Sequence, residues 1–307
     1  MTVSSTRSRY SNVAASDDAP RAARGTIFPV HDYDLATTLT SGQVFRWELR
    51  DRCWEGVIGQ RWVRLRADGA AIIAETADPV TDWRWLADYL QIGISLGGVL
   101  ATFPGDEPMR AAVAACRGLR LLRQDPWECL ASFIFSSTKQ IVQIRQIVAL
   151  LCERFGEPVA VPDGRRPAFA FPAPQRVAAA DESELRACKM GFRAPNLRAA
   201  ARKIVEGEVD LGRLATAPTG AARDELMRLP GVGRKIADCV LLFAYGFQDA
   251  FPVDVWVMKA LQHFYFPRRR VALQLLQKFA TSHFGPYAGY AQQYLFHYAR
   301  VHAKLKE

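Results

Sequence analysis

The chain has 307 residues, 50% hydrophobic content and a formal net charge of +9. This length and apolar content suffice for one large core or two linked cores, which excludes a wholly disordered chain. The positive charge favours a polyanionic partner such as nucleic acid, because each neutralised phosphate releases counterions.

The first segment, residues 1–24, is rich in Ser, Ala and Arg and lacks an apolar core of signal-peptide length. We therefore expect a disordered basic tail and no export. The longest apolar stretch, around residues 90–103, is too short and too glycine-rich to span a bilayer. We expect no membrane association, and a location in the cytoplasm with the nucleoid of a bacterium, or in the nucleus of a eukaryote.

A β-rich domain is expected over residues 25–115. From Gln43 to Glu75 apolar and polar residues alternate as in strands, and short charged or glycine-containing turns separate the runs. This pattern predicts an antiparallel meander. After Thr81 the spacing is helical, so the fold class is α+β, with an N-terminal antiparallel sheet packed on a mostly helical region, residues 116–307.

Two helices are predicted early in the helical region. Asp125 followed by Pro126 is a typical helix start, and strongly apolar residues follow. A second helix runs from Ile141 to Arg154 and stops near Gly156, which suits a C-terminal cap. The proline-rich segment 158–174 is expected to be a loop or an edge.

The sequence LPGVG, which starts at Leu229, predicts a tight turn between one helix that ends there and another that begins near Arg234. Gly231 and Gly233 let the backbone approach a phosphate, and the free N–H groups of the second helix favour an anion. We predict a helix-hairpin-helix that grips the DNA backbone without reading sequence. The alternative is an ordinary helical hairpin whose glycines only form the turn.

Lys235 follows the hairpin, beside the predicted phosphate site. A lysine becomes a nucleophile when burial or nearby cations favour its neutral amine, and Schiff-base chemistry requires an amine. Cys239 lies one helical turn later on the same face. Asp254 stands at a predicted helix start, where it suits an N-cap. Its carboxylate could also stabilise positive charge or relay protons near Lys235.

The six cysteines are scattered and form no Cys-x-x-Cys pair. Zinc and iron–sulfur sites usually draw ligands from such pairs, so the spacing suggests neither centre. We interpret the cysteines as reduced, buried apolar residues of an intracellular protein.

Together these residues resemble the HhH-GPD superfamily of DNA glycosylases, and more closely the 8-oxoguanine DNA glycosylase/lyase family. The resemblance covers nearly the whole chain after Thr26. It rests on SGQVFRW (41–47), GLRLLRQDPWECLASFIFSS (118–137), MGFRA (190–194), LPGVGRKIADC (229–239), PVDV (252–255) and AGYAQQYLF (288–296). It implies a TBP-like N-terminal domain and a C-terminal helix that completes the base pocket.

The resemblance also implies residue roles. Lys235 would displace the base and form an imine, while Asp254 assists. The Gly42 carbonyl would accept the N7 hydrogen that 8-oxoguanine has and guanine lacks. Gln292 would read the Watson–Crick edge of the extruded base, which Phe296 and Cys239 would enclose from opposite faces.

Contacts with the rest of the duplex follow in the same way. Phe192 and Arg193 resemble the pair that wedges into the duplex and contacts the opposite cytosine. The family also binds an alkali-metal ion, K⁺ or Na⁺, through hairpin carbonyls, here those of Met227, Leu229 and Val232. No cofactor is otherwise required.

The chain departs from the family pattern at positions expected to contact DNA. Thr138 and Lys139 stand where the family has an asparagine-rich run, and Gln143 stands where an arginine is typical. Trp256 replaces a phosphate-contacting histidine. We expect the preference for the opposite base to be relaxed, or moved onto Lys139 and Arg193.

The sequence thus predicts a monomeric, bifunctional DNA glycosylase and AP lyase that binds duplex DNA with a damaged base. It would remove 8-oxoguanine through a lysine Schiff base followed by β-elimination. A glycosylase of the same superfamily for another alkylated or oxidised purine is one alternative. A non-catalytic binder of damaged DNA is the other, and it would not need Lys235 together with Asp254.

Overall fold

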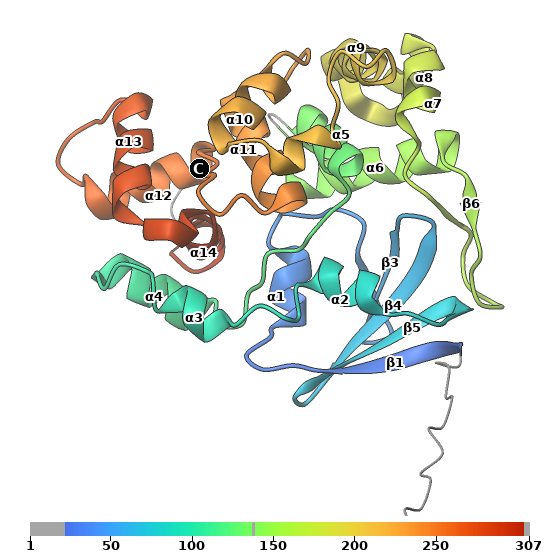
Figure 1. The fold of residues 1–307 in the computed structure, drawn as a ribbon, viewed down its shortest axis with the longest axis horizontal. Helices are drawn as coiled ribbons and strands as arrows, with labels where there is room; N and C mark the ends of the chain where they lie inside the picture. The colour runs from blue at the N-terminus through green and yellow to red at the C-terminus, as the bar shows by residue number, and fades with distance from the viewer. Residues whose placement is uncertain (1–21, 137–138, 304–307) are drawn as a thin grey trace, which may run out of the picture.

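The computed structural model describes residues 22–136 and 139–303. Most of the expected tail, residues 1–21, and Thr138 lie outside the described residues. The predicted α+β fold class is confirmed, with a five-stranded antiparallel sheet beside a mostly helical body (Figure 1). The first strand, β1 (Ala23–Pro29), already begins inside the range expected for the tail.

The sheet has the strand order β1-β5-β4-β3-β2. Its predicted meander is confirmed as β2 (Glu48–Arg50), β3 (Cys53–Ile58), β4 (Arg61–Asp68) and β5 (Ala71–Val80). The first predicted strand is shorter than expected, because Val44 and Trp47 are buried in a loop before it. The sequence analysis missed β1, an edge strand that pairs with β5 and is too exposed to alternate clearly.

Two helices, α1 (Leu35–Thr40) and α2 (Arg84–Leu90), form a core with the sheet. Leu65 of β4 and Ile72 of β5 point into this core, and Trp47 fills it from the loop before β2. The loop that contains Gly42 is therefore anchored on both sides by buried side chains.

Helices form most of the remaining described chain, with one short strand pair in the proline-rich segment. The elements are α3 (Leu96–Leu100), α4 (Glu107–Ala115), α5 (Pro126–Ser136), α6 (Ile141–Phe155), β6 (Pro158–Val159), β7 (Ala168–Phe169), α7 (Pro174–Ala179), α8 (Glu182–Leu185), η1 (Arg186–Met190), η2 (Gly191–Arg193), α9 (Ala194–Val205), η3 (Arg213–Thr216), α10 (Thr219–Met227), α11 (Arg234–Val240), η4 (Leu241–Tyr245), α12 (Val255–Tyr265), α13 (Leu273–His283), η5 (Gly285–Tyr287) and α14 (Ala288–Val301). None of the described helices is long and apolar enough to span a membrane.

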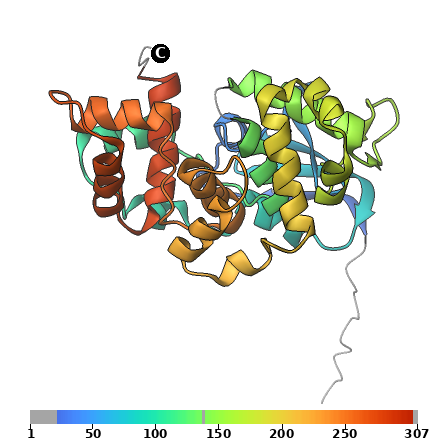
Figure 2. The same cartoon turned by 90° about the horizontal axis from the view of Figure 1, so that it is seen from above.

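Helix α5 lies at the centre of the larger core, with all of its residues buried except Pro126 and Glu128. The Asp125 carboxylate accepts a hydrogen bond from the Glu128 amide at 2.9 Å, which confirms the predicted helix start. Helices α10 and α11 lie between α5–α9 on one side and α12–α14 on the other (Figure 2). Helices α3 and α4, placed in the N-terminal domain by the sequence, also add buried residues to this larger core.

Helix α6 ends at Gly156, as predicted. However, Gly156 does not form the left-handed cap that glycine often provides at the end of a helix. Gly156 has a φ of −80°, which any residue can adopt. A Cβ there would lie 2.0 Å from the Ala170 carbonyl oxygen and 2.6 Å from that of Cys152. The glycine is therefore required by the close approach of two backbone segments.

We predict that Gly156→Ala lowers the free energy of unfolding by roughly 1 to 3 kcal/mol, because backbone atoms must shift to admit the methyl group. Urea denaturation measures this loss. Gly220→Ala is the matched control, since Gly220 lies exposed in α10 with open space for a Cβ. The control should be neutral or slightly stabilising, and an equal loss in both variants would contradict the explanation.

Candidate functional site

A cavity of about 1190 Å³ lies where the loop after α1 meets α5, α6, α11, α12 and α14. Most of the residues expected to act on or bind a base line its wall, although they come from distant parts of the sequence. They are Gly42, Lys139, Lys235, Cys239, Asp254, Gln292 and Phe296.

Lys235 and Asp254 occupy the start of two helices that face this cavity. The Asp254 carboxylate accepts a hydrogen bond from the Val257 amide at 2.8 Å, which confirms the predicted N-cap. Burial raises the pKa of Asp254, while the positive charge of Lys235 opposes that rise. The Lys235 ammonium lies 4.9 Å from the centre of the Phe133 ring. The site thus places an amine and a carboxylate together in an apolar setting.

Cys239 forms part of the wall one helical turn after Lys235. Burial raises the pKa of its thiol to about 12, and the positive charge of Lys235 offsets this only in part. The thiol is therefore protonated at neutral pH. Cys239 can pack against a ligand, but it does not compete with the amine as a nucleophile.

Gly42 is held tightly at the opposite side of the cavity. Its φ is +86°, and a Cβ would lie 2.9 Å from Ile141 and 3.3 Å from Phe296. The Gln293 side chain donates a hydrogen bond to the Ser41 carbonyl at 3.0 Å. Only glycine fits this position without strain, and the hydrogen bond holds the peptide group that joins Ser41 to Gly42.

Gln292 and Phe296 lie one helical turn apart on α14. Gln292 is only 3% exposed, and its side-chain oxygen has no hydrogen-bond partner among the described residues. A buried acceptor without a partner costs about 1 to 3 kcal/mol, so its presence in a cavity wall suggests a ligand that donates a hydrogen bond. The flat Phe296 ring beside it suits a planar ligand.

Two arginines of the cavity wall were missed by the sequence analysis. Arg300 donates a hydrogen bond to the Thr40 carbonyl at 3.1 Å, and burial lowers the pKa of its guanidinium. Arg145 has a buried Nε without a partner in the described chain. Arg300 could have been found, since it lies one turn after Phe296 on a helix already assigned to the pocket. Arg145 carried no such signal.

The predicted hairpin is present, although α10 ends at Met227, two residues earlier than expected. Gly231 has a φ of +80°, and a Cβ there would lie 2.9 Å from the side chain of Asn196. Gly233 is exposed, and the space for its Cβ is open. The protein itself thus requires the first glycine, whereas the second leaves room for an approaching group.

Phe192, Arg193 and Gln143 are not among the residues that line the cavity. Phe192 is 63% exposed on η2, with the Arg193 guanidinium 4.6 Å from its ring. Gln143 is exposed on α6, and its side-chain oxygen accepts a hydrogen bond from the Gln140 amide at 3.0 Å. In the described structure Gln143 therefore serves as a helix cap.

Comparison with protein families finds two matches that together cover most of the chain. Residues 26–130 match the family described as "8-oxoguanine DNA glycosylase, N-terminal domain". Residues 131–281 match the family described as "HhH-GPD superfamily base excision DNA repair protein". A probable N-glycosylase/DNA lyase of Methanothermobacter thermautotrophicus is 32% identical over 301 residues, which cover 89% of this chain and 95% of that protein.

Solved structures show the same similarity. The protein MBOgg1, bound to a low-affinity DNA ligand, is 34% identical, with a TM-score of 0.86 over 91% of this chain and 96% of that one. The 8-oxoguanine glycosylase/lyase of Clostridium acetobutylicum, bound to DNA with cytosine opposite 8-oxoguanine, is 29% identical. Its TM-score is 0.82 over 87% of this chain and 92% of that one.

The raised pKa of Asp254 predicts that Asp254→Asn stabilises the protein at neutral pH. Asparagine keeps the helix cap, while the variant avoids a buried negative charge. A carboxyl whose pKa is raised in the folded state stabilises the fold when protonated, and this contribution is lost as the pH rises from the ordinary value of 3.8 through the raised one. The gain is on the order of 1 kcal/mol per pKa unit.

Urea denaturation of both proteins over a pH series measures this difference. It should be largest at neutral pH and smallest below the ordinary carboxyl pKa. A difference that does not change with pH would contradict the assignment of a buried, destabilising carboxylate.

Proposed function

Because this chain belongs to the 8-oxoguanine DNA glycosylase family of the HhH-GPD superfamily, we propose that it is a bifunctional enzyme of base excision repair. It removes 8-oxoguanine from duplex DNA and then cuts the strand at the abasic site. The observation that carries the proposal is the placement of Lys235 and Asp254 in one cavity with Gly42, Gln292 and Phe296. The names of the relatives, glycosylase and lyase, favour an enzyme over a passive binder.

In the proposed mechanism the Lys235 ammonium first loses a proton to solvent, and the neutral amine then attacks C1′ of the damaged nucleotide. The bond from C1′ to the base breaks, and the base leaves with a proton. Asp254 stabilises the positive charge that develops on the sugar, and its burial strengthens that interaction. The sugar ring then opens to an imine on Lys235. Loss of a C2′ proton expels the 3′ phosphate by β-elimination, and water releases the product from the lysine.

The extruded base is recognised by polar and aromatic groups that already line the cavity in the free protein. Gln292 offers a buried acceptor without a partner, and its amide can pair with the Watson–Crick edge of the base. The base stacks between Phe296 and the thiol of Cys239. The Gly42 carbonyl accepts the N7 hydrogen, and it belongs to a loop position that only glycine fits without strain.

We propose that the hairpin and the exposed helix η2 contact the DNA outside the base pocket. Gly231 and Gly233 bring backbone amides to a phosphate. Phe192 enters the duplex, because an exposed aromatic ring on a short helix can fill the gap left by the flipped base. Arg193 contacts the opposite base. Lys139 lines the cavity and contributes a positive charge there.

We further propose that Thr138 and Gln143 adjoin the DNA near Lys139. The capping hydrogen bond uses only the side-chain oxygen of Gln143. The side-chain NH₂ group can therefore donate to the duplex.

The hairpin also fits the alkali-metal ion, K⁺ or Na⁺, that the family implies. The carbonyls of Met227, Leu229 and Val232 belong to the last turn of α10 and the hairpin, where helix carbonyls lack intrahelical partners. The Leu229 carbonyl accepts one bond, from the Val232 amide at 3.1 Å, which leaves a lone pair available. When bound, the ion would add positive charge beside a phosphate. Uncharged oxygens suit such a weakly held cation.

We propose that the enzyme acts as a monomer wherever the genome lies, in the cytoplasm of a prokaryote or the nucleus of a eukaryote. The β-rich residues 25–115 and the helical residues 116–307 are proposed as its two domains. Helix α14 belongs to the second domain and supplies four residues to the cavity wall, which it shares with loop residues of the first domain.

Borohydride trapping tests the nucleophile. Duplexes with 8-oxoguanine opposite each of the four bases should give a covalent adduct with the parent protein and none with Lys235→Gln. Lys139→Gln is the matched control, because that lysine lines the same cavity and should still form the adduct. An adduct that survives in Lys235→Gln, or disappears in Lys139→Gln alone, would overturn the assignment. The yields opposite the four bases report the opposite-base preference.

Gln292→Leu tests the recognition of the base separately from the chemistry. The variant removes a buried side-chain oxygen without a partner, so its free energy of unfolding should stay the same or rise. Excision of 8-oxoguanine should fall by roughly 5- to 30-fold, which corresponds to one or two kcal/mol. Cleavage of DNA that already contains an abasic site should change little. Equal losses in both reactions would show that Gln292 does not act through the base.

A further inference from the structure

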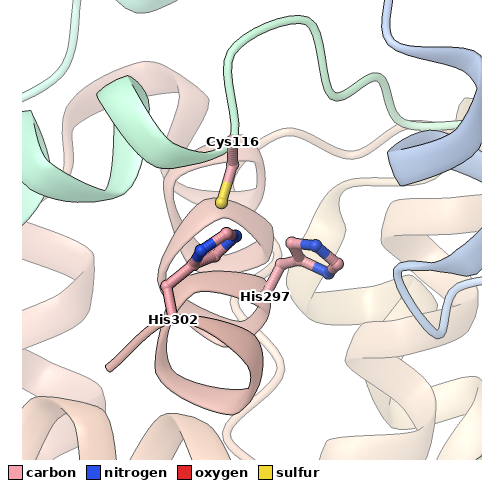
Figure 3. A group of neighbouring side chains, drawn as sticks. All are labelled: Cys116, His297 and His302. Carbon is pink, nitrogen blue, oxygen red and sulfur yellow. The ribbon is translucent and has the colours of Figure 1, made fainter. Parts of the chain in front are cut away.

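Three side chains from two distant parts of the chain converge near the end of α14, and none of them lines the proposed base pocket. Cys116 follows the last residue of α4, and His297 and His302 lie near the end of α14. The sulfur and one nitrogen from each ring all lie within 4.8 Å of one another. Figure 3 shows the Cys116 sulfur directed toward the His302 ring, with the His297 ring beside it.

We propose that Cys116, His297 and His302 bind one divalent metal ion of the zinc type, with water as the fourth ligand. One thiolate and two imidazoles are ligands that Zn²⁺ prefers, and three protein ligands leave one position open. Binding forms one metal–sulfur and two metal–nitrogen bonds, and the thiol proton passes to solvent.

His297 provides the observation that a packing role does not explain. Its side chain is 6% exposed, and its Nδ1 is buried without a hydrogen-bond partner in the described structure. A neutral imidazole with a free nitrogen is the form that binds a metal.

The geometry permits closure around an ion. Zinc bonds of about 2.0 to 2.3 Å place ligand atoms roughly 3.5 Å apart, so shifts of about an ångström suffice. His302 is exposed near the end of α14, where its side chain can adjust, and its ring stacks on Tyr298. Cys116 is buried at the end of α4, which packs against α14. Burial raises the pKa of the Cys116 thiol to about 12, so the free protein holds the thiol proton that the metal ion displaces.

The bound ion would join the end of α4 to the end of α14. Cys116 lies 181 positions before His297, so the bridge closes a long loop. His297 directly follows Phe296, and the metal would therefore hold the helix that carries the base-stacking ring. Metal binding should raise the midpoint of thermal unfolding, because the ion binds the folded chain in preference to the unfolded one.

Titration of the metal-stripped full-length protein with Co²⁺ tests the site, since a thiolate ligand gives an intense charge-transfer absorption. One equivalent should bind with that absorption, and Zn²⁺ should displace it. Cys116→Ser should abolish the absorption. His302→Gln should weaken binding by roughly tenfold or more. Its exposed position makes this second variant safe for folding.

His31→Gln and Cys53→Ser are the matched controls, because His31 is exposed and Cys53 is buried in the sheet domain. Both should bind Co²⁺ like the parent. The proposal is overturned if the parent shows no stoichiometric thiolate band, if the band persists in Cys116→Ser, or if His302→Gln binds with unchanged affinity.

Discussion

The hydrogen bonds of the buried Gln43 side-chain amide are the interaction on which the rest of the site depends. Its Nε2 donates to the carbonyls of Thr38 and Arg120, at 3.0 and 2.8 Å. Its Oε1 accepts from the Leu122 amide at 2.8 Å, and its own carbonyl accepts from Gln124. One side chain thereby joins α1, the loop after it and the segment that leads into α5. Because Gln43 is fully buried, breaking any of these bonds would leave a costly unpaired group.

This network explains how the sheet domain contributes to a cavity formed mainly by helices. Gly42 directly precedes Gln43, so the Gly42 carbonyl lies next to the residue that this network holds in place. Gln293 and Arg300 complete the support from α14 through the carbonyls of Ser41 and Thr40. Recognition of a single hydrogen on a base needs such a rigid acceptor, since an acceptor free to turn toward water would discriminate poorly.

Local signals in the sequence predicted the parts of the fold that short-range physics determines. The alternation in β3 to β5, the Asp125 cap and the Asp254 cap each depend on residues a few positions apart. The edge strand β1 was missed because pairing with β5 holds it, and no strong alternation marks it. The network of Gln43, the position of Arg145 and the meeting of Cys116 with His297 depend on tertiary packing. Gly42, Gln292 and Phe296 were predicted from the family resemblance. The periodicity of the sequence alone could not predict that these three residues lie in one cavity.

The two buried glutamines show how stability and function diverge within one molecule. Gln43 has its polar atoms paired within the protein, and it stabilises the fold. Gln292 is buried to a similar degree but leaves its oxygen without a partner, as do Arg145 and Arg300 for one nitrogen each. Each such atom lowers the free energy of unfolding by about 1 to 3 kcal/mol. Three of them in one cavity wall therefore remove a large part of the stability of an ordinary protein. Their cost falls when a polar, planar ligand enters. A site that is unsatisfied when empty therefore gains more from a base that supplies the matching hydrogen bonds than from one that does not.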